Sequence, residues 1–176
     1  HAPSVAFAGA NGHPFDALRP ETVLDAVEHL GVASDGRLFA LNSFENRVYL
    51  VGREGAEPLI AKFYRPGRLS DAEILEEHAF LDELAAADLP VAAAIRDGDG
   101  RSLVEIHLDA RAASEDASGS AASTYRVALF PKLRGRAPEL EADEHLEWLG
   151  RLIARLHGVG RAGRFQQRPP LSIARL

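Results

Sequence analysis

The chain has 176 residues, of which 46% are hydrophobic and 26% are charged, and its formal net charge is −6. This length is enough for one domain with a buried core, and the negative charge argues against binding nucleic acid through a basic face. The chain has no cysteine, which excludes disulfides, thiolate catalysis and cysteine-ligated zinc.

The first part of the chain predicts one helix and three strands. Residues 19–31, RPETVLDAVEHLG, place a proline in a first helical turn and a glycine at the stop. Apolar runs then predict strands over 38–41, 48–51 and 58–64, with a turn signal at 52–55. Strands this close in sequence are most simply antiparallel.

A second helix and a hairpin are predicted next. Ser70 is suited to cap a helix that runs to about Ala86, because acidic residues follow it in the first turn. The segments DLPVAAAI (88–95) and RSLVEIHL (101–108) bracket the turn sequence DGDG at 97–100, which is a hairpin pattern.

The remaining chain predicts an insertion, a strand and a long helix. Residues 109–124 are small and polar without periodicity, and we interpret them as a mobile insertion. The sequence TYRVALFP predicts a strand that ends at Pro131. A helix is predicted over 140–160, ending at Gly158 or Gly160. Its apolar face consists of Leu146, Leu149, Ile153 and Leu156.

Lys62 stands in the apolar run LIAKFY of the third strand, where a charge is unexpected. At about 100° per residue, the second helix places Glu77 on its apolar side, whereas Glu76 points nearly the opposite way. An unpaired buried charge costs on the order of a few kcal/mol, and a pair of Lys62 and Glu77 would remove both costs. The apolar side of this helix consists of Ile74, Leu81 and Leu84. The alternative interpretation is that Lys62 lies on a solvated edge of the sheet and that Glu77 lies at the border between the apolar and polar sides of the helix.

The order of these features is that of a kinase small lobe, in which a sheet lysine holds ATP phosphates and a helix glutamate holds the lysine. The stretches ALNSFENRVYLV, AKFYRPGR, ILEEHAFLDEL and YRVALFPKLRGR closely resemble the bacterial stress response kinase A family. These serine/threonine kinases are built like aminoglycoside phosphotransferases and choline kinases. The resemblance runs from Pro14 to the end of the chain. It implies an α+β fold, with a five-stranded antiparallel sheet and one helix forming a small lobe.

The resemblance also implies an ATP site. Lys62 would bind ATP phosphates and pair with Glu77, and the turn LNSFEN between the first two strands would cover the phosphates, although it lacks the glycines of ordinary protein kinases. The stretch 130–133 would be the hinge, whose backbone groups meet adenine. The residues implied at this site are Ser43, Asn46, Lys62, Glu77, Phe130, Lys132 and Leu133.

The family's remaining catalytic elements are absent from the sequence. Its catalytic loop, H-G-D-x-x-x-x-N, and its magnesium-binding aspartate would lie beyond Leu176, so we expect no catalytic base and no Mg²⁺ ligand within the chain. The expected organisation is a tail over 1–18, a small lobe over 19–133, and the start of a truncated large lobe over 134–176. By this interpretation the chain alone transfers no phosphate.

Alternatives to a protein kinase remain open from the sequence. The hydroxyl acceptor would be a protein or a small molecule, the latter in a phosphotransferase of the aminoglycoside or choline kinase type. A truncated, non-catalytic nucleotide-binding module is the second class of function. We expect a monomeric cytoplasmic protein without a membrane or nucleic-acid partner, because no apolar run reaches about 18 residues and the start has no signal-peptide pattern.

Overall fold

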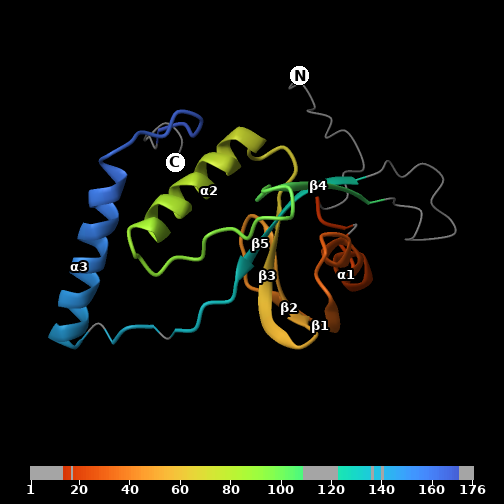
Figure 1. Ribbon diagram of the computed structural model, residues 1–176, viewed down its shortest axis with the longest axis horizontal. Coiled ribbons are helices and arrows are strands. Elements are labelled where there is room, and N and C mark those ends of the chain that lie inside the picture. Colours follow the sequence, from red (N-terminus) through yellow and green to blue (C-terminus); the bar gives the residue numbers. More distant parts are fainter. Residues whose placement is uncertain (1–13, 17, 109–122, 136, 140, 171–176) are drawn as a thin grey trace, which may run out of the picture.

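The computed structural model describes residues 14–16, 18–108, 123–135, 137–139 and 141–170. A five-stranded antiparallel sheet with the strand order β1-β2-β3-β5-β4 forms its centre, so the predicted α+β fold is confirmed (Figure 1). No helix of this described part is long and apolar enough to cross a lipid bilayer. The elements are α1 (Pro20–His29), β1 (Ser34–Leu41), β2 (Arg47–Arg53), β3 (Ala56–Tyr64), α2 (Asp71–Ala86), β4 (Val104–Leu108), β5 (Ser123–Pro131) and α3 (Asp143–Gly160).

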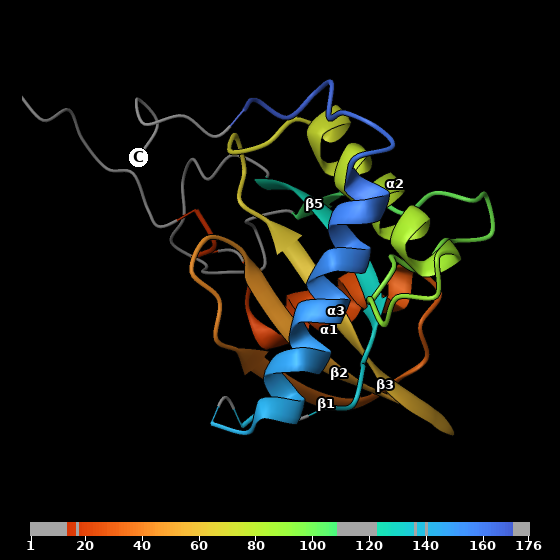
Figure 2. The same ribbon diagram turned by 90° about the vertical axis from the view of Figure 1, so that its left-hand side faces the viewer.

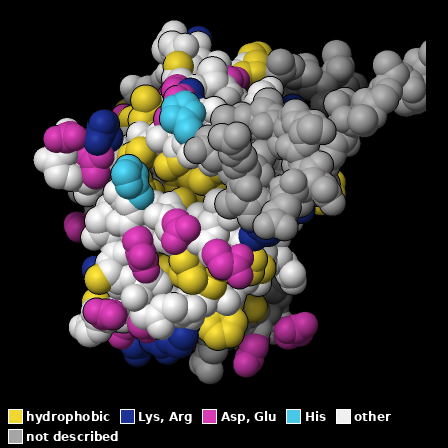
Figure 3. Space-filling model, turned by 90° about the vertical axis from the view of Figure 1, so that its right-hand side faces the viewer, with side chains coloured by type: hydrophobic (Ala, Val, Ile, Leu, Met, Phe, Trp, Pro, Cys, Tyr) yellow, Lys and Arg dark blue, Asp and Glu magenta, His cyan; other side chains and the backbone are white. Residues whose placement is uncertain are grey.

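The helices lie in layers on the two sides of the sheet. In Figure 1, α1 lies on one side, α2 on the other, and α3 beyond α2, and the turned view in Figure 2 shows the same order from the α3 side. Figure 3 shows the opposite side, where acidic side chains are scattered over the described surface.

Strand β3 supplies both faces of the sheet, because successive side chains of a strand point to opposite sides. Leu59, Ala61 and Phe63 belong to the core cluster that includes α1. Ile60 and Tyr64 belong to the cluster that includes α2. Position 62 therefore falls on the α2 face, and the apolar run in the sequence is two alternating sets of residues.

The core beneath α1 extends further toward the N-terminus than the sequence predicts. Phe15 and Leu18 are buried in it with residues of α1 and the sheet, and the Tyr125 hydroxyl donates to the Pro14 carbonyl at 2.8 Å. These residues, which were expected to belong to a tail over 1–18, are therefore packed against the small lobe.

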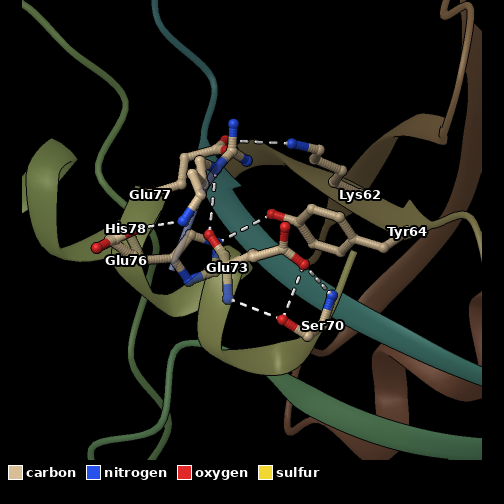
Figure 4. A network of polar contacts seen from close by, with 8 residues as sticks. Lys62, Tyr64, Ser70, Glu73, Glu76, Glu77 and His78 are labelled. Carbon is tan, nitrogen blue, oxygen red and sulfur yellow. Dashed lines mark hydrogen bonds and ion pairs between the residues drawn. The ribbon is translucent and has the colours of Figure 1, made fainter. Parts of the chain in front are cut away.

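Helix α2 begins with the predicted cap. The Ser70 hydroxyl accepts a hydrogen bond from the Glu73 backbone N–H, and the Glu73 carboxylate accepts from the Ser70 N–H at 2.8 Å (Figure 4). This capping box satisfies two backbone donors that the first helical turn leaves free. It fixes the first turn of the helix that carries the acidic residues of the site.

The predicted hairpin around residues 97–100 is wrong in its first strand. The turn forms, because the Gly100 N–H donates to Asp97 O at 3.0 Å, but residues 90–97 are not a strand. Strand β4 pairs instead with β5, its later neighbour in the chain. Pro90 has no N–H to give to a ladder, and the preceding segment meets the sheet through one bond, from Ile95 N–H to Leu129 O at 2.7 Å.

Two further predictions concern the second half of the chain. Residues 109–122 of the predicted insertion lie outside the described residues, and residues 123 and 124 already belong to β5, so the predicted boundary is too late. Helix α3 forms as predicted and ends at Gly160. None of its residues is buried, and its apolar face includes the exposed side chains of Leu146, Ile153 and Leu156.

Candidate functional site

Lys62 lies at the middle of the sheet. Its Cα is paired with Val48 on β2 and with Ala128 on β5, so two strands flank it, and the solvated edge position of the alternative interpretation is wrong. The side chain keeps 21% of its surface exposed. The ammonium group lies 4.4 Å from the centroid of the Tyr64 ring, two residues along the same face, a distance at which a cation is attracted by the aromatic face.

The predicted ion pair between Lys62 and Glu77 is present. Lys62 Nζ lies 3.4 Å from Glu77 Oε1 (Figure 4), within the ~4 Å at which an ion pair is counted. Glu76 makes other contacts. The 100° step of the helix thus assigns the two adjacent glutamates correctly from the sequence.

A buried polar chain that was not predicted from the sequence lies beneath this pair. The ring of His78 is 1% exposed. Its Nε2 lies 2.9 Å from the Tyr64 hydroxyl, and its Nδ1 lies 2.9 Å from the Ser102 hydroxyl. The chain links β3, α2 and the segment before β4. Position 78 is four residues after the buried Ile74, so helical spacing alone could have identified a buried histidine.

The environment keeps the aromatic members of this chain neutral. Burial raises the pKa of Tyr64, and the negative charge of Glu77 raises it further. Burial lowers the pKa of His78, and this effect exceeds the opposing effect of Glu77. A neutral imidazole donates through one ring nitrogen and accepts through the other, which matches one hydroxyl partner on each side.

A segment after α3 docks onto the same helix. Glu76 accepts hydrogen bonds from the backbone N–H groups of Gln166, Gln167 and Arg168, the last at 2.8 Å. Partial burial raises the pKa of the Glu76 carboxyl, but these backbone donors lower it more, so the net shift is downward. The Arg168 guanidinium forms an ion pair with Glu77. No element was predicted in this region from the sequence, and both contacts were missed.

The other predicted site residues lie around the sheet ends. The Ser43 hydroxyl donates to Asn46 O at 2.7 Å and closes the turn between β1 and β2, while Asn46 Oδ1 accepts from the Arg65 N–H at 3.2 Å. At the end of β5, Phe130 is buried with its ring edge-to-face to His78 at 5.7 Å. Lys132 and Leu133, which follow β5, are exposed.

The described residues contain no group of three or more His, Asp or Glu side chains that could hold a metal ion. His145, near the start of α3, contacts the backbone of Glu139 at 3.1 Å. Arg134, just after β5, pairs with Glu57 at 2.8 Å. The charged groups that contact one another at Lys62 are two cations, Lys62 and Arg168, and the carboxylate of Glu77.

The catalytic base and the metal ligands were expected beyond Leu176, and this expectation stays a prediction. Leu176 and the rest of the segment 171–176 lie outside the described residues, so the structure places no group at that end of the chain. The last described residue, Pro170, follows closely on the segment that docks on α2. Arg168 is therefore the site residue nearest to Leu176 that the structure describes.

Comparison with known proteins shows which sequences resemble the chain. The sequence pattern of the "Phosphotransferase enzyme family" matches residues 38–176, so the match continues to Leu176. Stress response kinase A of Salmonella choleraesuis (strain SC-B67) is 37% identical over 164 residues, which are 93% of this chain and 45% of that protein. Serine/threonine protein kinase RdoA of Salmonella typhimurium (strain LT2) has the same identity and coverage. The chain thus spans about half the length of the curated relatives that it matches.

A solved structure shares the fold. The amicoumacin kinase hAmiN, determined in complex with AMP-PNP and Ca²⁺, superimposes with a TM-score of 0.66 at 21% identity. The match covers 85% of this chain and 42% of that chain. The likeness supports the kinase-like small lobe predicted from the sequence.

Proposed function

Because the chain belongs to the phosphotransferase enzyme family, we propose that it is the nucleotide-binding part of an ATP-dependent kinase that phosphorylates serine or threonine hydroxyls. The observation that carries the proposal is the pair formed by Lys62 on β3 and Glu77 on α2. In kinases, a sheet lysine held by a helix glutamate binds the phosphates of ATP. The protein acceptor is inferred from the relatives, which include a serine/threonine protein kinase.

The ammonium group of Lys62 fits a phosphate ligand. Its contact with Glu77 Oε1 is 3.4 Å long, whereas charge-assisted hydrogen bonds are usually about 2.7–2.9 Å. An ammonium group has three donors, and a single long contact leaves donors for another acceptor. Ala128, the residue paired with Lys62 on β5, has a small side chain. ATP would supply the transferred phosphoryl group, and Lys62 would hold and orient its phosphate oxygens.

The turn and the hinge would complete the nucleotide contacts. We assign Ser43 and Asn46 to the phosphate end, because the bond between them shapes the turn that follows β1. Phe130, Lys132 and Leu133 would meet the adenine through backbone groups where the chain leaves β5, as the resemblance implies. The burial of Phe130 against His78 fixes the start of that stretch.

The base and the Mg²⁺ ligands are proposed to come from a second lobe, whose catalytic loop would lie beyond Leu176. The described residues offer no metal-binding cluster, and phosphoryl transfer needs a metal to neutralise phosphate charge and a residue to orient the nucleophile. Exposed apolar side chains on α3, among them Leu146, Ile153 and Leu156, support such a lobe. Scattered exposed apolar residues are normal, but a continuous helix face indicates a partner surface.

A lysine-selective NMR titration tests the proposal. The chain has only two lysines, Lys62 and Lys132, so ¹³C-lysine labelling gives two sets of side-chain signals. We expect ATP to shift the Lys62 signals in a saturable way, and Lys62→Met to weaken ATP binding about tenfold, since one charge-assisted contact is lost. The matched control is Lys132→Met, whose side chain is exposed and whose proposed contact uses the backbone. Saturating ATP that leaves the Lys62 signals unmoved would refute the proposal.

A further inference from the structure

Glu77 has two cationic partners, one for each carboxylate oxygen. Oε1 faces Lys62 Nζ at 3.4 Å, and Oε2 is bound by the Arg168 guanidinium. The side chains of Lys62, Glu77 and Arg168 are 21%, 29% and 34% exposed, so the three charges interact in partly buried surroundings. Coulomb interactions are stronger there than in open solvent.

Arg168 is held rigidly to α2, which distinguishes it from a surface arginine that meets a carboxylate by chance. Its backbone N–H donates to Glu76 Oε2 at 2.8 Å, and its Nε donates to the Glu73 carbonyl at 3.2 Å. Its terminal nitrogen binds Glu77. Three separate bonds therefore fix one residue against the stretch of the helix from Glu73 to Glu77, about one turn, although 91 positions separate it from Glu77 in the sequence.

The two contacts of Glu77 differ in length. The contact of Glu77 with Arg168 is the shorter of its two, while the contact with Lys62 exceeds the usual 2.7–2.9 Å of a charge-assisted bond. The terminal torsion of a glutamate is soft and has no sharp preference. Without the arginine, the carboxylate would be free to rotate and close fully onto the ammonium group of Lys62.

We propose that Arg168 is a positioning residue of the nucleotide site, which holds Glu77 so that the glutamate orients Lys62 without pairing closely with it. The ammonium group then stays available for the phosphates of ATP. This inference rests on the proposed role of Lys62 as a phosphate ligand. It adds a residue from outside the small lobe to that site, acting through Glu77 and not by contact with the nucleotide.

The test compares Arg168→Met with Arg164→Met. Arg164 lies in the same segment, is exposed, and makes no ion pair with a described residue, so its loss removes an equal charge without touching Glu77. In the nucleotide-free chain, we expect the ¹³C signals of Lys62 to move in Arg168→Met and to stay in place in Arg164→Met. We expect ATP binding to weaken about three- to tenfold in Arg168→Met only, which lies in the lower part of the range of coupling between contacting groups.

A double-mutant cycle shows whether Arg168 acts through Glu77. In a Glu77→Gln background, Arg168→Met should cause little further loss of ATP affinity, because the group that it positions has already lost its charge. Additive losses would mean that Arg168 acts by its charge alone, and they would overturn the inference. A melting curve of each variant verifies that it is folded.

The positioning role and the proposed function fail in different ways. If ATP shifts the Lys62 signals of the unmodified chain, but Arg168→Met and Arg164→Met bind ATP equally well, the positioning role is overturned and the nucleotide site stands. If ATP leaves the Lys62 signals of the unmodified chain unmoved, the proposed function is overturned and the positioning role with it.

Discussion

Replacing His78 with leucine is expected to lower the free energy of unfolding by about 1–5 kcal/mol, because it leaves two buried hydroxyl groups without a partner. The hydroxyls belong to Tyr64 and Ser102, each 2.9 Å from a ring nitrogen of His78. Both residues are almost fully enclosed, with 3% and 4% of their surface exposed. Water therefore cannot readily replace the lost imidazole.

The magnitude follows from the number of groups left unsatisfied. Each buried donor or acceptor without a partner costs about 1–3 kcal/mol, so two of them cost about 2–6 kcal/mol. Leucine resembles histidine in size and is more apolar, so its burial offsets roughly 1 kcal/mol of this loss. Domains are stable by only about 5–15 kcal/mol in total, which makes the expected change a large fraction of the whole.

Urea unfolding followed by circular dichroism measures this change, provided that the dependence on urea concentration is the same in both proteins. The control is His107→Leu, because the His107 side chain on the edge strand β4 is 64% exposed, and it should change stability by less than about 0.5 kcal/mol. A triple variant, Tyr64→Phe with His78→Leu and Ser102→Ala, removes all three polar groups and should recover most of the loss. A stable single variant, or a triple variant no better than the single one, would refute the reasoning.

Two further predictions concern acidity and turnover. Because burial lowers the pKa of His78 in the folded state, the unfolded chain binds more protons below about pH 6.5, and stability should fall as the pH drops through that value. In His78→Gln, the slope of unfolding free energy against pH should be shallower in this window, and an unchanged slope would contradict the assignment. The purified chain, incubated with labelled ATP, Mg²⁺ and myelin basic protein, is predicted to transfer no phosphate beyond the level of Lys62→Ala, because the H-G-D-x-x-x-x-N pattern that would supply the catalytic base does not occur in its sequence. Metal-dependent incorporation that is lost in Lys62→Ala would show a complete site within the chain.

The sequence predicts those features of the site that depend on local geometry. The two-residue period of a strand accounts for Lys62 among apolar neighbours, and the 100° step of a helix selects Glu77 over Glu76. The cap at Ser70 likewise depends on four adjacent residues. Such rules act within one element, so they can be applied before any tertiary contact is known.

Features that join distant segments were missed for a physical reason. The docking of Arg168 on α2 depends on contacts over 91 or more positions, and no period or cap in the sequence indicates them. Strand β4 was assigned to a hairpin because short connections usually join neighbouring strands, yet its partner is β5. Which strand pairs with β4 depends on contacts throughout the sheet, and a short local sequence pattern does not contain them.

The adjacent glutamates of α2 connect the site to the rest of the chain in opposite directions. Glu77 reaches Lys62 in the sheet, and Glu76 holds the backbone of the segment that follows α3. A shift of α2 away from the sheet by only about 1 Å would carry the 3.4 Å contact beyond the ~4 Å range of an ion pair. The position of α2 therefore determines how strongly Glu77 restrains Lys62. The segment that binds Glu76 and Glu77 helps to hold α2 in that position.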